Sequence, residues 1–222
     1  MGGSCCGEGP DLGRSSAPFK RALWAVIAIN AAMFAIEMTA GQLAGSQALK
    51  ADALDFAADT ATYGISLAVL GASLRFRATA ALAKGASLLV MGVWVFGSTL
   101  WAALGPGLPE APVMGTVGLL ALAANLASVL LLLNFRDGDA NVRSVWLCSR
   151  NDAIGNVAVV LAALGVFGTG TAWPDLLVAG IMSALFLGAS VSILRQAVTE
   201  LRTGNADGKA AEPGHRPEAQ AR

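Results

Sequence analysis

The feature that most restricts the fold of this chain is a series of hydrophobic segments, each long enough to cross a lipid bilayer. A membrane-spanning helix needs roughly 20 mostly apolar residues. Six segments of about this length follow one another along the sequence. They run approximately from Arg21 to Leu43, Leu49 to Leu74, Thr79 to Leu104, Val113 to Phe135, Val142 to Phe167 and Pro174 to Ala197. The sequence therefore predicts an all-α integral membrane protein with six transmembrane helices.

The composition agrees with a membrane protein and excludes several other classes. Charged residues make up 14% of the chain, whereas a soluble domain carries about 25%. The formal net charge is +0, which gives no reason to expect a nucleic-acid partner. The sequence contains no nucleophile–base pair, phosphate-binding loop or nucleotide motif, so we do not expect an enzyme. The polar start of the chain does not resemble a cleavable signal peptide.

The distribution of basic residues predicts the orientation in the membrane. Cytoplasmic ends and loops of membrane proteins are enriched in lysine and arginine. One set of ends and loops holds Lys20, Arg21, Arg75, Arg77, Lys84, Arg136, Arg143, Arg195 and Arg202, and the opposite set holds only Lys50. Both termini are therefore expected in the cytoplasm. We expect a disordered cytosolic leader over residues 1–20, a six-helix membrane domain over 21–202 and a disordered cytosolic tail over 203–222.

Three carboxylates interrupt the second hydrophobic segment, in the stretch KADALDFAADTATYG. Asp52, Asp55 and Asp59 are separated by three and then four residues, so a helix places all three on one stripe. Ionisable residues inside a membrane are expensive and usually functional. Two nearby carboxylates in a poorly solvated site also need a cation or a proton between them. This stripe is therefore expected to bind a metal ion or protons.

The fifth segment repeats the arrangement in WLCSRNDAIGN, where Cys148, Asp152 and Asn156 follow one another at intervals of one helical turn. If the second and fifth helices face each other, they supply four ligands of oxygen and sulfur type: Asp55, Asp59, Cys148 and Asp152. Such a set suits a tetrahedral divalent ion such as zinc. The thiol favours softer ions over magnesium or calcium. We expect supporting roles for Asp52, Asn156, Glu37 and Asn30.

Each of these residues also has a structural interpretation. A lone aspartate in a membrane helix can serve only to hydrogen-bond a neighbouring helix. A lone cysteine is more often a small buried apolar residue than a ligand. The matched pairs on two helices favour the metal site over these alternatives, most strongly at Asp55 and Asp59.

These motifs together resemble the cation diffusion facilitator (cation efflux) family. The run from Asn30 through Glu37, followed by GQLAGSQALKADALDFAAD, resembles the first two helices of that family. NVRSVWLCSRNDAIGN resembles its fifth-helix signature, and WPDLLVAGIMSALFL its final helix. The resemblance extends roughly from Ala22 to Leu201. It implies a homodimeric exporter in the inner membrane of a bacterium, moving divalent metal out of the cytoplasm against protons, with no cofactor beyond the transported ion.

By position, the resemblance assigns Asp55 and Asp59 to the ligand pair of the second helix and Asp152 to the aspartate of the fifth. Cys148 stands where the family usually has histidine, and the second-helix pair is Asp/Asp rather than His/Asp. Zinc is the leading ion, with cadmium or cobalt as alternatives. A proton-coupled exporter of organic cations and a non-transporting metal sensor or assembly protein are alternative functions.

The ends of the chain also differ from the family pattern. The family usually continues into a cytoplasmic domain of ferredoxin-like fold, and the short tail after Arg202 predicts a form without that domain. The vicinal Cys5 and Cys6 in the leader are expected to capture a soft metal ion and pass it to the membrane site, although an unstructured pair without a role is the alternative.

Overall fold

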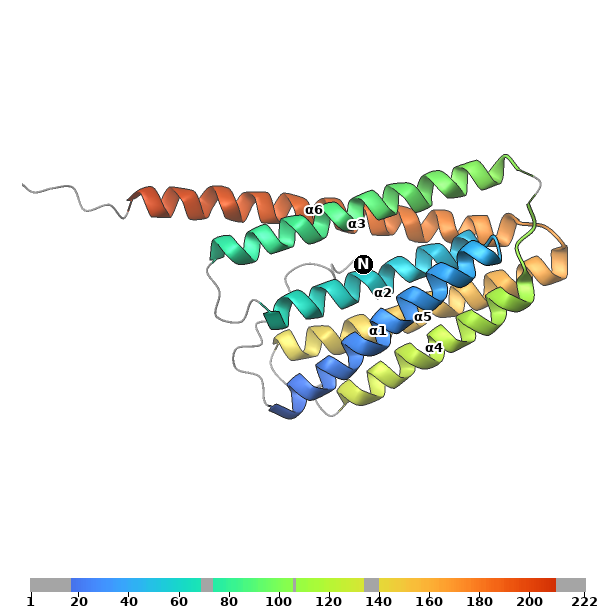
Figure 1. The fold of residues 1–222 in the computed structure, drawn as a ribbon, viewed down its shortest axis with the longest axis horizontal. Coiled ribbons are helices and arrows are strands. Elements are labelled where there is room, and N and C mark those ends of the chain that lie inside the picture. Colours follow the sequence, from blue (N-terminus) through green and yellow to red (C-terminus); the bar gives the residue numbers. More distant parts are fainter. Residues whose placement is uncertain (1–16, 69–73, 106, 134–139, 211–222) are drawn as a thin grey trace, which may run out of the picture.

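A computed structural model describes residues 17–68, 74–105, 107–133 and 140–210 as six helices (Figure 1). They are α1 (Ala17–Leu43), α2 (Gln47–Ala68), α3 (Leu74–Ala103), α4 (Ala111–Leu132), α5 (Ala140–Thr169) and α6 (Trp173–Ala210). No strand occurs within these ranges. The predicted all-α fold with six helices is therefore confirmed. Cys5 and Cys6 lie outside the described residues.

Several helix ends differ from the expected boundaries. The second predicted segment ran to Leu74, but α2 ends at Ala68 and Leu74 is the first residue of α3. Consequently α3 begins five residues before the expected Thr79. The last helix continues to Ala210, past the expected boundary of the membrane domain at Arg202. The remaining tail residues 211–222 lie outside the described part of the chain.

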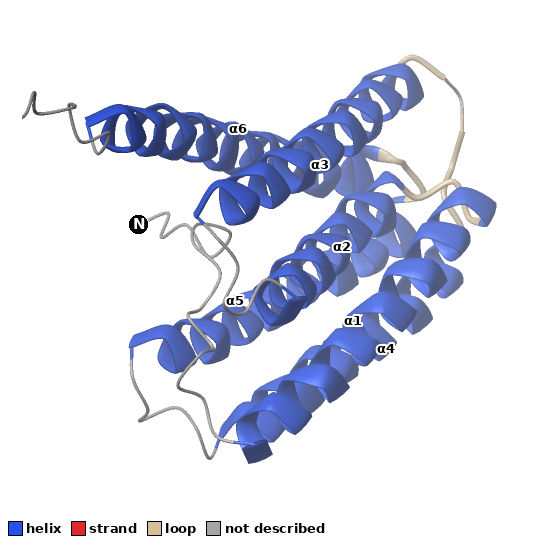
Figure 2. Ribbon diagram, turned by 60° about the vertical axis from the view of Figure 1, so that its left-hand side comes forward, coloured by secondary structure: helices blue, strands red, loops and turns tan. Residues whose placement is uncertain are grey.

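The helices form two groups that are joined mainly through α2 and also where α5 meets α6. Helices α1, α2, α4 and α5 pack together, and α3 pairs along its length with α6 beside them (Figure 2). Glycines bring α3 and α6 close together: a Cβ atom at Gly92 would lie 2.9 Å from Leu187 Cδ2, and one at Gly85 3.0 Å from Leu194 Cδ2. Such close approach is typical of helix pairs in membranes. Helix α1 begins and α6 ends at the same end of the bundle, which we call the terminal end.

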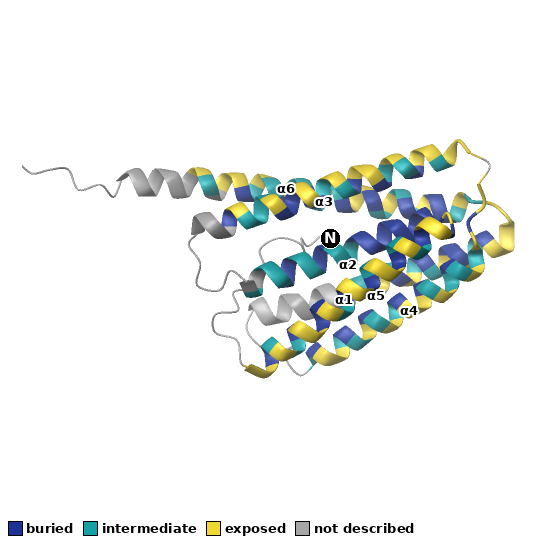
Figure 3. Ribbon diagram, in the orientation of Figure 1, coloured by how far each residue is buried: buried dark blue, intermediate teal, exposed yellow. Residues whose placement is uncertain are grey.

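Helix α2 lies at the centre of the bundle and contacts each of the other five helices. Those five are long and apolar enough to cross a membrane by length and composition, whereas α2 is not among them. Its three aspartates make α2 too polar to count as such a span. The protein tolerates them because the surrounding helices, and not lipid, face its polar stripe. Figure 3 shows α2 as largely buried, with exposed residues on the outward faces of its neighbours.

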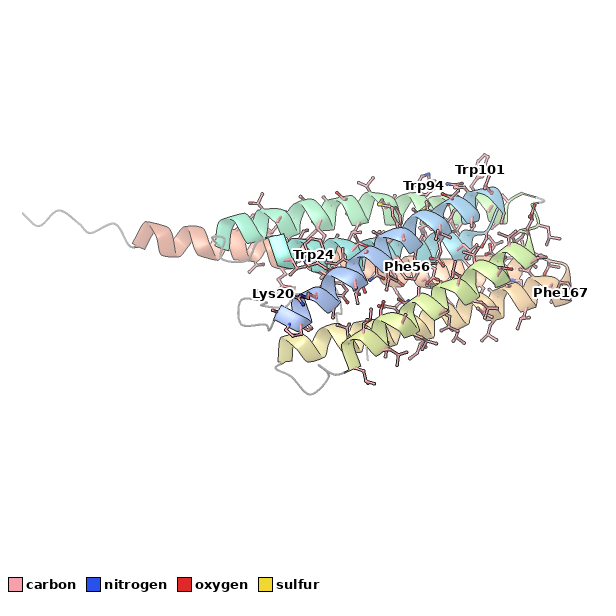
Figure 4. The ribbon with its side chains drawn as sticks, turned by 60° about the horizontal axis from the view of Figure 1, so that its bottom comes forward. Lys20, Trp24, Phe56, Trp94, Trp101 and Phe167 are labelled. Carbon is pink, nitrogen blue, oxygen red and sulfur yellow. The ribbon has the colours of Figure 1, made fainter. Side chains whose placement is uncertain are left out.

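The outward surface of the bundle is apolar, as a lipid environment requires. Large exposed side chains include Val90, Trp101, Leu130, Leu164, Phe167 and Leu185. Figure 4 shows Trp101 and Phe167 at one end of the bundle and Lys20 at the other, with Phe56 between them. Exposed aromatic residues at a bundle end fit the interface between lipid and water. The chain is thus a multi-pass integral membrane protein.

The start of α2 is capped by a residue of α6. Gly45 has a φ of 71°, a left-handed conformation that glycine adopts without strain, and it closes the turn between α1 and α2. The following Ser46 donates its hydroxyl to Asp175 Oδ1 at 2.7 Å. The Gln47 amide donates to Asp175 Oδ2 at 2.8 Å, and the Ala48 amide to Oδ1 at 3.0 Å. Asp175 therefore satisfies the first amides of α2 and joins it to α6 at the end opposite the terminal end.

Replacing Asp175 with alanine is expected to destabilise the protein by about 3 kcal/mol, since a buried group without its partner costs about 1–3 kcal/mol and several would lose theirs. The measurement is thermal unfolding of the purified protein in detergent. Asp175→Asn keeps an acceptor oxygen and should lose less stability. An unfolding temperature in Asp175→Ala equal to that of the native protein would show that the cap contributes nothing.

Candidate metal centre

The centre of the bundle brings together two carboxyl groups from different helices. Asp59 of α2 is buried, at 8% exposure, and Asp152 of α5 is half-buried. Helices α2 and α5 are in contact, and the carboxyl groups of Asp59 and Asp152 interact directly. Two carboxylates this close cannot both stay ionised without a cation or proton between them. The arrangement can therefore hold a divalent cation, a proton or both in turn.

The other two predicted ligands belong to the same helices. Asp55 lies one turn before Asp59 on α2, is half-buried and interacts with Glu37 of α1. Cys148 lies one turn before Asp152 on α5, but its side chain is outside the described part of the structure. Among the side chains that are described, no three Asp, Glu, Cys or His residues converge on one point. The set of four ligands thus stays a prediction. Of the four, Asp59 and Asp152 are the two whose side chains interact directly in the structure.

A second pair of acids lies on the side of this centre away from the terminal end. Glu37 of α1 and Asp52 of α2 are 0% and 1% exposed, and their carboxyl groups interact with each other. No donor among the described residues hydrogen-bonds either oxygen of Glu37. The sequence assigned both residues a supporting role, and Asp52 lies two helical turns before Asp59 on α2.

Two buried asparagines complete the polar interior. Asn30 of α1 and Asn156 of α5 are each 1% exposed. Within the described ranges, the Nδ2 and Oδ1 atoms of Asn156 form no hydrogen bond, and neither does Nδ2 of Asn30. Buried polar groups in proteins are nearly always satisfied, so such exceptions often mark an ion or water position. Asn156 lies one turn beyond Asp152, which is where the sequence placed it.

Sequence reasoning did not identify Lys84 as part of this centre. It assigned Lys84 to an end or loop, but the residue lies well inside α3 and is 8% exposed. Its ammonium donates a hydrogen bond to Thr62 Oγ1 and interacts with the Asp59 carboxyl. Tyr63 of α2 also interacts with Asp59. The expected helix started at Thr79, which left Lys84 near a helix end. Because α3 starts at Leu74, Lys84 lies further inside the helix.

The fold and the polar interior together are those of a membrane protein with a pathway for cations or protons. Six helices enclose buried carboxyl groups on a central helix whose neighbours are apolar on the outside. Intramembrane acids that face a bundle interior are typical of pathways for cations or protons.

Comparison with known protein families identifies the family within this class of membrane proteins. Residues 23–202 match the cation efflux transmembrane domain. The chain belongs to this cation efflux family, as its motifs predicted.

Curated relatives are bacterial. The zinc transporter ZitB of Escherichia coli strain K12 is 28% identical over 198 residues, covering 83% of this chain and 63% of the relative. The metal cation efflux system protein CzcD of Cupriavidus metallidurans is 24% identical over 200 residues, covering 85% and 63%. The cadmium, cobalt and zinc/H(+)-K(+) antiporter of Bacillus subtilis strain 168 is 24% identical over 183 residues, covering 76% and 59%. The matched part of the chain thus corresponds to less than two thirds of each relative.

Proposed function

We propose that this chain exports a divalent metal cation, with zinc as the leading candidate, in exchange for protons. The observation that carries the proposal is the contact between the Asp59 and Asp152 carboxyl groups at the centre of a membrane bundle. Membership in the cation efflux family supports it, as does the naming of relatives as zinc, cadmium and cobalt transporters.

The proposed mechanism is alternating access around this centre. Asp55, Asp59, Cys148 and Asp152 bind the ion when the centre is open to the cytoplasm, and each must be deprotonated to do so. When the centre opens to the other side, protons return to the ligands and displace the ion. Metal or protons therefore neutralise the carboxylates at every stage, which is why the membrane tolerates them.

The ligand set bears on the choice of ion. Three carboxylates and one thiolate would carry more negative charge than a dication neutralises, so at least one group is expected to keep a proton during the cycle. The Cys148 thiolate favours borderline and soft ions. Zinc fits this set, and cadmium and cobalt are the alternatives that the relatives' names also include.

The surroundings of the transport centre complete the proposal. The protein would work in a bacterial inner membrane, as a homodimer and without a resident cofactor. Asp52, Glu37, Asn30 and Asn156 would support the path of the ion through the bundle. Cys5 and Cys6 would capture a soft ion in the cytosol and deliver it to the terminal end.

The proposal is tested by metal flux into proteoliposomes that hold the purified full chain, with zinc, cadmium and cobalt offered in parallel. An imposed pH gradient is expected to drive uptake of zinc, and a protonophore that collapses the gradient should stop it. Liposomes without protein give the background rate.

The same assay separates the alternatives. An organic-cation exporter would move a fluorescent organic cation along the pH gradient and leave zinc flux at background. A sensor or assembly protein would bind zinc and move neither. Either result would contradict the proposed function.

A further inference from the structure

Among the side chains that the structure describes, Lys84 is a buried cation that interacts with Asp59 of the candidate metal centre. The transport cycle proposed above gives it no role. It comes from α3, which belongs to the helix pair beside the group of four helices that includes α2 and α5 (Figure 2). At 8% exposure its side chain is shielded by the surrounding helices. An ammonium group in such a position needs an opposite charge to be tolerated.

A hydrogen bond to Thr62 places the Lys84 ammonium on the face of α2 that carries Asp59. The ammonium donates this bond to the hydroxyl of Thr62, which in turn donates to the Ala58 carbonyl at 2.6 Å. Thr62 and Asp59 are three residues apart on α2, so they share one face of the helix. The ammonium also interacts with the Asp59 carboxyl, which faces Asp152 of α5 and Tyr63 of its own helix.

The other buried charges in the described ranges lie in separate pairs. The Glu37–Asp52 pair lies further along the bundle, away from the terminal end. Lys50, a second buried lysine in the described part of the chain, interacts with Asp175 near the cap of α2. Asp59 thus interacts with both a cation and a second carboxyl group.

A divalent ion bound between Asp59 and Asp152 would occupy the region that the ammonium already neutralises. Like charges repel strongly in a poorly solvated site. The metal ion and Lys84 therefore compete for the Asp59 carboxylate, and a weaker bond between the carboxylate and the metal favours release.

We propose that Lys84 is a tethered counter-ion that binds Asp59 when the centre holds no metal and lowers the affinity of the centre for the transported ion. This inference rests on the proposed metal site. Because Lys84 stands on α3 and Asp59 on α2, the exchange of partners also links the occupancy of the centre to the contact between these two helices. The contact has a second point at the opposite end, where Ser98 donates to Gln47 Oε1 at 2.8 Å.

The test is the equilibrium affinity of the purified full chain for Zn²⁺, measured by competition with a chromophoric chelator at one fixed pH. Lys84→Met is expected to bind Zn²⁺ about tenfold more tightly than the native protein, since removal of a competing charge worth about 1.4 kcal/mol changes a binding constant tenfold. Lys84→Arg keeps the charge and should stay near the native value. Lys50→Met removes the other buried lysine and should also leave the affinity unchanged.

A purely structural role for Lys84 predicts a different result. If the residue only anchors α3 to α2 through Thr62, Thr62→Val should change the affinity as much as Lys84→Met does. Lys84→Gln, which keeps hydrogen bonding without charge, replaces Lys84→Met if the latter does not fold.

Zinc binding by the native protein distinguishes a failure of the counter-ion from a failure of the proposed function. A native protein that binds Zn²⁺, together with charge-removing variants that bind it no more tightly, overturns the counter-ion. A native protein that binds no Zn²⁺ overturns the proposed function itself, and the counter-ion with it.

Discussion

Asp59→Ala is expected to reduce zinc flux by about 100-fold or more. Loss of a residue that merely orients a metal ligand already costs about 10–100-fold in affinity or activity, and Asp59 is proposed as a ligand itself. It is also the carboxyl group that Asp152, Tyr63 and Lys84 share. The measurement is the initial rate of zinc uptake into proteoliposomes under a fixed pH gradient.

Two further variants separate a lost ligand from a damaged fold. Glu110→Ala removes an exposed acid that precedes α4 and should transport at the native rate. Asp59→Ala also leaves Lys84 without its carboxylate, and a buried charge without a partner is strongly destabilising. The double variant Asp59→Asn/Lys84→Met removes both charges and should fold, yet still fail to transport. Native flux in this double variant would show that Asp59 matters only as a partner of Lys84.

Cys148→His is expected to lower the ratio of cadmium to zinc transport by about tenfold or more. A thiolate favours soft ions, whereas imidazole suits zinc and other borderline ions. Cys148 lies one turn before Asp152 on α5, in the register of a ligand to the same ion. The measurement is parallel flux of the two ions through the native protein and the variant.

The role of the thiol can also be seen directly by spectroscopy. Cobalt bound to the native protein should show the charge-transfer absorption of a cobalt–thiolate bond, and Cys148→Ser should lose it. This comparison is made with Cys5 and Cys6 replaced by serine, so that only Cys148 can contribute a thiolate. Equal spectra for the two proteins would exclude Cys148 from the metal site.

Much of the fold could be predicted from the sequence, because the bilayer imposes a length and an apolar composition on each helix. The spacing of Asp55 and Asp59 on one helix, and of Cys148 and Asp152 on another, predicted a shared metal site on the condition that the two helices face each other. The structure has these helices in contact through Asp59 and Asp152. Such pairs are recognisable because carboxylates inside a membrane have few other reasons to occur.

The contacts between helices far apart in sequence could not be predicted in the same way. The periodicity of one helix tells which of its faces is buried, but not which residue of another helix lies opposite. Asp175 is an example: it caps α2 from the first turn of α6. Lys84 is another: it was expected near the end of a helix that starts at Thr79, but α3 starts at Leu74 and Lys84 interacts with Asp59.

The most direct test of the central claim is a zinc titration of the purified protein that records the ions bound and the protons released per chain. Cys5 and Cys6 are replaced by serine so that the leader cannot bind metal. We expect one zinc ion per chain at the membrane centre, with release of protons, because its ligands must be deprotonated to bind. The same titration of Asp59→Asn/Asp152→Asn should show no zinc bound at this centre and no protons released. Full zinc binding in that double variant would contradict a metal site between α2 and α5.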